Sequence, residues 1–291
     1  MLKKKNIDLC FAIDQQHTKP LWITLFSILE NTECTLNVFI FNNGLEEDIY
    51  ISVIREQLCK RGGVLTLLDP IADHNTHLPE KTPHKTKVAR LKFDLGIIDK
   101  PRILYLDTDL LVRGDIEKLF NLEMSGHILA AAPDINNKVF NKNLGLVNKH
   151  IYFNSGVLLV DLNLWRNSNI SEKLHKTQKD NQEKFSYVDQ DAFNVVFDGK
   201  YKQMNLRWNF PYNPRLVKHS LPRYIYAYRK ACSMYESMSS YFSPKIVHFI
   251  GVPKPDTHGL VTGIYKEFGN LCLVAEKITM ETHNKMNTIS K

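Results

Sequence analysis

The stretch most informative about the fold is Arg102-Ile103-Leu104-Tyr105-Leu106-Asp107-Thr108-Asp109-Leu110-Leu111-Val112. It begins as an apolar run typical of a buried strand, and two carboxylates one residue apart follow that run. Side chains alternate along a strand, so Asp107 and Asp109 face the same way while strand geometry lasts. Two converging carboxylates suit a divalent ion such as Mg²⁺ or Mn²⁺, whose open positions take up substrate phosphates. Because Asp-x-Asp is common, a polar turn after the strand is the alternative.

Strand-like and helix-like segments alternate along the chain. Strands are predicted over Ile7–Ile13, Leu36–Phe41, Val64–Leu68 and Ile103–Leu106. Helices are predicted over Leu21–Asn31, Glu46–Lys60, Lys87–Leu95 and Asp189–Phe197. This alternation predicts an α/β protein with one Rossmann-like, mostly parallel sheet and helices on both faces. Ligands of such sheets bind beyond the carboxyl ends of the strands, where Asp14 and the Asp107/Asp109 pair would lie.

The composition fits a globular protein that can bury a core. Hydrophobic residues make up 43% and charged residues 24% of the 291 residues. No apolar stretch approaches the ~20 residues needed to span a bilayer, and a signal peptide is not expected at the N-terminus. The five cysteines are scattered, odd in number and without metal-ligand spacing, which predicts reduced thiols and a cytoplasmic location.

The net charge of +7 leaves three interpretations. A basic protein attracts an anionic small substrate. The cluster Lys3-Lys4-Lys5 favours peripheral contact with the anionic inner membrane surface. The third interpretation is a generally basic surface that aids solubility. No Lys/Arg stripe interleaved with aromatic residues is present in the sequence, so nucleic acid is not an expected partner.

Four further segments place polar groups where a ligand could bind, and each has a structural alternative. Asp14 closes the first strand and could accept from a ribose hydroxyl or a uracil N–H, or cap a loop. Gly156, ahead of an apolar strand, could let the backbone approach a ligand or only serve a turn. Asp189 could act in a site or cap the helix that it opens. His248 ends the strand-like Lys245–Phe249, and a lone histidine is more often structural.

The ordered set of motifs resembles glycosyltransferase family 8, the retaining sugar-nucleotide transferases that include glycogenin and bacterial lipo-oligosaccharide galactosyltransferases. The bacterial α-1,4-galactosyltransferase branch is the most similar. The motifs that carry the resemblance are Phe11-Ala12-Ile13-Asp14, Ala89-Arg90-Leu91, Leu104-Tyr105-Leu106-Asp107-Thr108-Asp109, Phe153-Asn154-Ser155-Gly156-Val157, Asp189-Gln190-Asp191 and His248-x-x-Gly251-x-x-Lys254-Pro255.

The resemblance implies a GT-A type fold over residues 1–255 and a small C-terminal helical or irregular extension over residues 256–291. It implies that Asp107, Asp109 and His248 bind Mn²⁺, with Mg²⁺ as the alternative, and that the ion bridges the diphosphate of a UDP-sugar. The nucleotide and diphosphate contacts implied in the same way are Ala12, Asp14, Gln16, Asp107, Thr108, Gly251 and Lys254. The groups implied around the donor sugar and the reaction are Arg90, Asp134, Asn154, Asp189 and Gln190.

The implied reaction transfers a hexose, galactose before glucose, from a UDP-hexose to an oligosaccharide or glycolipid acceptor in bacterial surface-glycan biosynthesis. Two routes retain the anomeric configuration: attack by the acceptor hydroxyl on the leaving-group face, or double displacement through a carboxylate. Gln190 favours the first route because a neutral amide is a poor nucleophile. Asp189 is the carboxylate for the second.

Several segments depart from the family pattern or lie outside its motifs. Val88 stands where tyrosine is common, and Asp256 where an aromatic residue often follows the Lys-Pro pair. The polar segment Asp69–Lys87 is predicted to be a lid or an acceptor-binding loop. The tyrosines of His219–Tyr241 are predicted either to form a platform for sugar rings or to pack in an irregular subdomain.

Two other functions stay open at this point. A metal-dependent phosphohydrolase or nucleotidyltransferase would use the same carboxylates, but would need no role for Asp189 and Gln190. A non-catalytic protein that binds a sugar nucleotide or glycan is disfavoured, because the metal ligands and the phosphate-binding Lys254 are all present.

Overall fold

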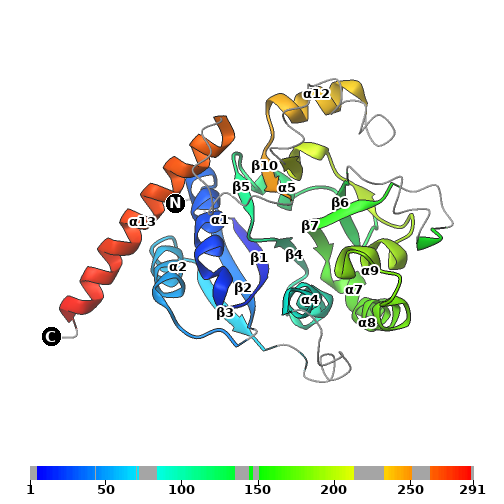
Figure 1. The fold of residues 1–291 in the computed structure, drawn as a ribbon, viewed down its shortest axis with the longest axis horizontal. Helices are drawn as coiled ribbons and strands as arrows, with labels where there is room; N and C mark the ends of the chain where they lie inside the picture. The colour runs from blue at the N-terminus through cyan, green and yellow to red at the C-terminus, as the bar shows by residue number, and fades with distance from the viewer. Residues whose placement is uncertain are drawn as a thin grey trace.

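The computed structural model describes residues 5–42, 44–69, 71, 84–134, 144–146, 151–212, 233–250 and 263–289. A seven-stranded sheet forms its centre, with the strand order β3-β2-β1-β4-β7-β6-β8 (Figure 1). The strands of this sheet are β1 (Asn6–Ile13), β2 (Thr35–Asn42), β3 (Val64–Leu68), β4 (Arg102–Leu106), β6 (Leu129–Pro133), β7 (Phe153–Asp161) and β8 (Lys202–Gln203). Only β7 runs antiparallel to its neighbours β4 and β6, so the sheet is mostly parallel.

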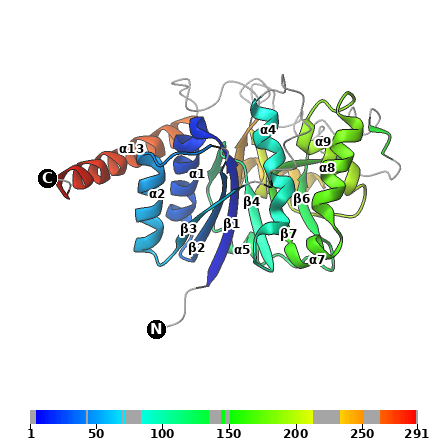
Figure 2. The ribbon, with the colours of Figure 1, turned by 90° about the horizontal axis from the view of Figure 1, so that it is seen from below.

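Helices cover both faces of the sheet (Figures 1 and 2). The α-helices are α1 (Thr18–Asn31), α2 (Ile49–Lys60), α4 (His84–Arg90), α5 (Glu117–Phe120), α7 (Leu162–Asn167), α8 (Ile170–Asn181), α9 (Val188–Val196), α12 (Met234–Phe242) and α13 (Gly263–Ile289). Short 3₁₀ helices are η1 (Gln15–His17), η2 (Leu91–Ile97) and η3 (Leu206–Trp208). Helices α1 and α2 lie on one side, while α4, α7, α8 and α9 lie on the other (Figure 2). The predicted α/β class, with a Rossmann-like sheet, is confirmed.

Local sequence explains how two of these helices begin. The carboxylate of Asp48 accepts hydrogen bonds from the backbone N–H groups of Tyr50 and Ile51, which caps α2. Asp161 ends β7 and accepts from the N–H of Leu164, which caps α7 directly after the strand. Because Asp48 is the cap, α2 begins at Ile49, three residues after the predicted start at Glu46.

Buried aromatic rings join the helices of the second layer to one another. Phe93 of η2 packs edge-on against Phe193 of α9, with ring centroids 5.6 Å apart. The ring of Trp165 of α7 lies 6.1 Å from that of Phe193. All three rings are almost fully buried, so the position of η2 relative to α7 and α9 is set by close packing.

A smaller sheet stands at the edge of the first and consists of β5 (Leu110–Val112), β10 (Ile246–Phe249) and β9 (Phe210–Tyr212). Strand β10 pairs antiparallel with β5 and parallel with β9. Since β5 begins one residue after Asp109, this sheet brings residues near position 248 next to the end of β4.

Helix α13 lies outermost, against α1 and α2 (Figure 1). The indole Nε1 of Trp22 donates to the backbone carbonyl of Ala275 at 3.2 Å, and Thr282 bonds to Glu56 at 2.9 Å. Within the described residues, no helix has the length and apolar character needed to cross a lipid bilayer. The predicted domain boundary at residue 255 falls outside the described residues.

Two predicted segments differ from the structure. The expected helix Lys87–Leu95 is an α-helix that ends at Arg90 and continues as the 3₁₀ helix η2, with a kink at Asp94. The expected turn at residues 154–156 lies within β7, and the Gly156 carbonyl accepts from the N–H of Asp107, one residue beyond the end of β4.

Candidate active site

The two carboxylates lie in the connection between β4 and β5, and three elements hold its backbone. Thr24 of α1 donates its hydroxyl to the carbonyls of Thr108 and Leu110. The N–H of Asp107 donates to the Gly156 carbonyl at 2.8 Å, and the N–H of Phe249 donates to the Asp109 carbonyl at 3.0 Å. Asp107 and Asp109 are therefore held in place by α1, β7 and β10 together.

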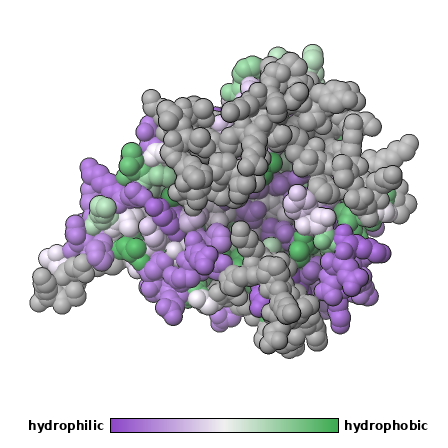
Figure 3. Space-filling model, in the orientation of Figure 1, coloured by the Kyte–Doolittle hydropathy of each residue, from purple (hydrophilic) through white to green (hydrophobic). Residues whose placement is uncertain are grey.

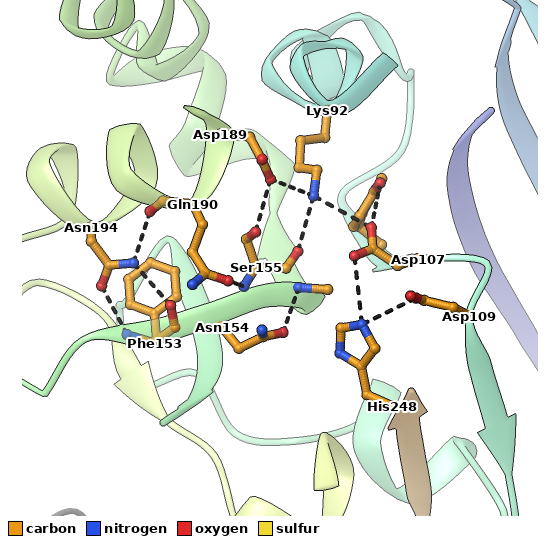
Figure 4. Close-up of polar contacts among 12 residues, drawn as sticks. Lys92, Asp107, Asp109, Phe153, Asn154, Ser155, Asp189, Gln190, Asn194 and His248 are labelled. Carbon is orange, nitrogen blue, oxygen red and sulfur yellow. Dashed lines mark hydrogen bonds and ion pairs between the residues drawn. The ribbon is translucent and has the colours of Figure 1, made fainter. Parts of the chain in front are cut away.

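Asp107, Asp109 and His248 converge on one point (Figure 4). The Nε2 atom of His248 is 3.1 Å from Oδ1 of Asp109 and 4.0 Å from Oδ2 of Asp107. One ligand atom from each residue falls within 4.8 Å of the others, and in the described parts of the chain this is the one cluster of that kind. Two carboxylates and an imidazole are a donor set that fits Mn²⁺ or Mg²⁺.

The second nitrogen of His248 is held from behind. Its Nδ1 lies 2.9 Å from Oδ1 of Asn209, which is 2% exposed and follows η3. An amide oxygen only accepts, so Nδ1 carries a proton, and Nε2 faces the cluster. This is the ring orientation that a metal ligand requires.

Gly156 of β7 lies directly against two of the three ligands. A Cβ atom on this residue would meet Cε1 of His248 at 2.3 Å and Oδ2 of Asp107 at 2.8 Å. Gly156 lies inside β7 rather than in a turn, and its absent side chain makes room for His248 and Asp107.

Lys92 is the principal side chain of the site that sequence reasoning missed. It extends from η2 and its side chain is 3% exposed. Its Nζ lies 2.8 Å from Oδ2 of Asp189 and 3.4 Å from Oδ1 of Asp107 (Figure 4). The same atom lies over the Tyr105 ring, 4.7 Å from its centroid. Burial by itself would lower the pKa of Lys92, but the two carboxylates outweigh it and raise that pKa. The ammonium thus joins the two acidic groups.

Asp189 and Gln190 lie in the first turn of α9 and face the same site. Oδ2 of Asp189 accepts from Ser155 Oγ at 2.9 Å as well as from Lys92. Asp189 makes no cap on α9, so the capping alternative is wrong. Instead Asp191 accepts from the N–H groups of Ser186 and Tyr187, which secures the start of the helix.

Gln190 connects this turn to Asp134. Its Oε1 accepts from the backbone N–H of Ser155 at 3.1 Å, and its Nε2 donates to Oδ2 of Asp134 at 3.2 Å. Asn154 donates to the same Asp134 oxygen at 3.3 Å. The structure therefore brings together four of the residues predicted near the donor sugar, Asn154, Asp134, Asp189 and Gln190.

Arg90, also predicted near the donor sugar, closes α4 and is 5% exposed. Its Nη2 lies 3.4 Å from Nδ1 of His175, whose Nε2 is 2.8 Å from Oδ1 of Asp94. Burial lowers the pKa of Arg90, against an opposing effect of the Asp94 carboxylate. The guanidinium stays a cation near neutral pH, because arginine is not deprotonated in folded proteins.

The residues predicted at the nucleotide differ in what they already contact. Asp14 is buried, caps η1 by accepting from the Gln16 N–H at 3.0 Å, and contacts the His17 ring. Its capping alternative is thus observed. Gln16 is exposed, Ala12 and Thr108 are half-buried. The predicted diphosphate contacts Gly251 and Lys254 lie outside the described residues.

The predicted acceptor regions are described only in part. Of the proposed lid Asp69–Lys87, residues 70 and 72–83 lie outside the described residues, and the segment from His84 belongs to α4. Of the proposed aromatic platform, the part before residue 233 is not described. On α12, Met234, Tyr235 and Phe242 are exposed by 66%, 82% and 66%, and apolar surface appears at the top of Figure 3. Tyr241 instead packs against Phe210.

The mostly parallel sheet with helices on both faces is a GT-A type fold. The sequence profile of Glycosyl transferase family 8 matches residues 8–256, so the chain belongs to glycosyltransferase family 8. The predicted resemblance is thereby confirmed.

Individual relatives agree with this assignment. A putative glycosyltransferase of Haemophilus influenzae is 27% identical over 222 residues, which cover 74% of this chain and 66% of that protein. A lipopolysaccharide 1,2-glucosyltransferase of Escherichia coli K12 is 25% identical over 86% of this chain and 72% of its own. The crystal structure of the galactosyltransferase LgtC with donor and acceptor sugar analogues superimposes with a TM-score of 0.76 at 23% identity, covering 91% of this chain and 95% of that one. This last similarity shows a shared fold.

Proposed function

We propose that this chain is a retaining, Mn²⁺-dependent hexosyltransferase. Its donor is a UDP-hexose, galactose before glucose, and its acceptor is a glycan of the bacterial surface such as lipopolysaccharide or lipo-oligosaccharide. The observation that supports this most is the convergence of Asp107, Asp109 and His248 beside Asp189 and Gln190 in a family 8 chain. A lipopolysaccharide glucosyltransferase among the relatives supports the acceptor class.

The residues of the cluster fit the proposed ion. Asp107 turns Oδ1 toward Tyr105 Oη at 2.9 Å and toward Lys92, which leaves Oδ2 on the side of His248. His248 presents Nε2 to the same point because Asn209 holds its other nitrogen. Once bound there, Mn²⁺ would supply positive charge to the diphosphate leaving group. Magnesium is the alternative ion.

The polar groups beyond the cluster would receive the donor sugar. Asn154, Asp134 and Gln190 form one connected set, and the Arg90 guanidinium lies on the neighbouring α4. Such preorganised dipoles stabilise charge that develops in the transition state without reorganising at that moment. The sugar gains oxocarbenium character as its bond to the diphosphate breaks, and the Gln190 carbonyl is a neutral dipole suited to stabilising it.

The contacts of Asp189 support attack on the leaving-group face over double displacement. Its Oδ2 already accepts from the Lys92 ammonium at 2.8 Å and from the Ser155 hydroxyl at 2.9 Å. Two strong donors lower the nucleophilicity of a carboxylate oxygen, because they stabilise the charge that would attack. We therefore assign Asp189 a positioning role and leave the acceptor hydroxyl to attack directly. Arg90, Asp134 and Gln190 remain the proposed groups at the sugar.

The nucleotide-binding residues are proposed on the family pattern. Ala12 lies near the carboxyl end of β1, Asp14 and Gln16 follow that strand, and Thr108 follows β4, at the edge where parallel sheets bind ligands. Gly251 and Lys254 are proposed for the diphosphate. A cytoplasmic location with transient contact to the inner membrane surface, where a glycolipid acceptor would be met, is proposed from the basic net charge of +7.

The experiment measures UDP release from a panel of UDP-sugars, with Mn²⁺ and with a chelator, before any acceptor is known. Slow Mn²⁺-dependent hydrolysis of one donor supports the proposal and identifies the sugar. Release of UMP or free sugar phosphate instead would favour the phosphohydrolase or nucleotidyltransferase alternative. Metal-independent cleavage of every donor at equal rates would contradict the proposed site.

A further inference from the structure

An unbroken series of hydrogen bonds runs from the metal-site histidine to the groups proposed at the donor sugar. His248 Nδ1 donates to Asn209 Oδ1 at 2.9 Å, and Asn209 Nδ2 donates to Asn154 Oδ1 at 2.8 Å. Asn154 Nδ2 then donates to Asp134 Oδ2 at 3.3 Å, which also accepts from Gln190 Nε2 at 3.2 Å. Every donor in the first three steps points away from His248, so the series has one direction.

Asn209 is the one member of this series that neither the family motifs nor its position along the chain suggests. It is 2% exposed and lies between η3 and β9, the strand next to the β10 strand that carries His248. Its side chain uses both ends of the amide: the oxygen accepts from the imidazole, and the nitrogen donates to Asn154. An amide offers its acceptor and its donors on two separate atoms, which a hydroxyl of similar size does not.

The Asn154 amide can take only one orientation, so it couples Asn209 to Asp134. Its Oδ1 accepts from Asn209 and also from the backbone N–H of Gly156 at 2.9 Å, so its amide is fixed in one orientation. That orientation directs its Nδ2 to Asp134. An amide turned the other way would set two N–H groups against each other at Asn209 and Gly156, which costs the desolvation of buried donors.

We infer that Asn209 is a positioning residue that fixes the metal-binding tautomer of His248 and, through Asn154, the orientation of the Asp134–Gln190 pair. This inference rests on the proposed metal-dependent function and adds to it a residue with two separable roles. The acceptor oxygen of Asn209 sets the ion affinity through His248. Its donor nitrogen sets the geometry at the sugar, and hence the rate of transfer.

Two substitutions separate these roles. Asn209→Ala removes both contacts, so Mn²⁺ affinity is expected to fall by about tenfold or more, and kcat is expected to fall even at saturating Mn²⁺. Asn209→Asp keeps an acceptor against Nδ1, and a carboxylate there makes the imidazole a better ligand. The Mn²⁺ affinity of Asn209→Asp is therefore expected to be equal or tighter. This variant loses the donor to Asn154, so its kcat is expected to fall by about tenfold.

The matched control is Asn205→Ala. Asn205 is exposed and caps the same η3 turn by accepting from the Arg207 N–H at 3.0 Å, and its Oδ1 also accepts from Ser240 Oγ at 3.5 Å, so these hydrogen bonds lie outside the series. This variant loosens the same turn, so it reports what local destabilisation alone does. Its Mn²⁺ affinity and kcat are expected to equal those of the unmodified protein.

The measurement is a calorimetric titration of Mn²⁺ into the full chain without donor, followed by UDP-release kinetics at saturating Mn²⁺. Retained Mn²⁺ affinity together with a reduced kcat in Asn209→Asp supports the inference. This result supports it even where Asn209→Ala does not fold. Unchanged kcat in Asn209→Asp, or equal losses in Asn205→Ala, overturns it. Absence of Mn²⁺ binding by the unmodified protein overturns the proposed function itself, and the inference with it.

Discussion

Gly156→Ala is predicted to damage the metal site from the side of β7. The added Cβ would sit 2.3 Å from Cε1 of His248, against 3.4 Å or more for ordinary contact, so the ring must withdraw by about 1 Å. The same methyl would lie 2.8 Å from Oδ2 of Asp107. Ligand distances at a metal tolerate only about 0.2 Å of error. We therefore expect the Mn²⁺ affinity to fall by about 10²-fold, close to 3 kcal/mol.

The assay is calorimetric titration of Mn²⁺ into Gly156→Ala, with UDP release measured over a range of Mn²⁺ concentrations. If the loss is one of ion affinity, high Mn²⁺ restores part of the activity, whereas a misfolded variant stays inactive. The control is Gly269→Ala in α13, where an added Cβ meets no atom within 4 Å and alanine favours the helix. Unchanged Mn²⁺ affinity in Gly156→Ala would refute the assignment of His248 and Asp107 as ligands.

Three further outcomes follow from the buried groups and the C-terminal helix. Lys92→Met leaves the charges of Asp189 and Asp107 without their ammonium, so denaturant unfolding should show a loss of about 3 kcal/mol, smaller with Mn²⁺ present; no loss would contradict the ion pairs. Burial raises the pKa of Tyr105 well above its ordinary 10.0, so above pH 10 the unfolded chain binds fewer protons and stability falls as pH rises. Tyr105→Phe should flatten that decline by up to about 1.4 kcal/mol per pH unit, seen in unfolding curves between pH 9 and 11; an identical slope would argue against a buried phenol. Removing residues 256–291 uncovers α1 and Trp22, so the chain should still unfold cooperatively but with about 3 kcal/mol less stability; loss of cooperative unfolding would show that α13 belongs to the same folding unit.

Local pattern was sufficient for the parts of the site built along one strand. The apolar run before Asp107 predicts β4, and strand alternation predicts that Asp107 and Asp109 face the same way. The strand forms as predicted because β4 is central and buried, so its pattern is strong. Asp107 and Asp109 also converge, but both lie after the end of β4, where backbone hydrogen bonds with Gly156 and Phe249 hold them. The positions of Asp14 and the start of α9 followed from the same alternation of strands and helices.

Contacts between distant segments could not be predicted in this way. Strand β7 runs antiparallel, so its N-terminal end, with Asn154 and Gly156, lies at the edge where the parallel strands end. The rule that ligands bind beyond the carboxyl ends of parallel strands does not identify residues at the N-terminal end of an antiparallel strand. His248 stood out at the end of a strand and the family motif supported it, but the strands that flank it, β5 and β9, are far away in sequence.

Lys92 and Asn209 gave no signal because the sequence shows neither burial nor partners. A lysine after Leu91 in a helix-like segment is typical of a solvated face. Its true environment depends on η2, whose 3₁₀ geometry and packed Phe93 turn Lys92 toward the carboxylates. Asn209 follows a short turn with no periodic pattern, and its two partners come from β7 and β10.

The most direct test of the account is a calorimetric titration of UDP into the unmodified protein and into Asp109→Asn, each with Mn²⁺ and with a chelator. Oδ1 of Asp109 lies 3.1 Å from Nε2 of His248. Replacing this carboxylate with an amide of the same shape should weaken binding of the ion and leave the fold intact. The account predicts that UDP binds the unmodified protein about tenfold or more tightly with Mn²⁺, and that Asp109→Asn loses this difference. Equal UDP affinity with Mn²⁺ and with chelator, in both proteins, would contradict it.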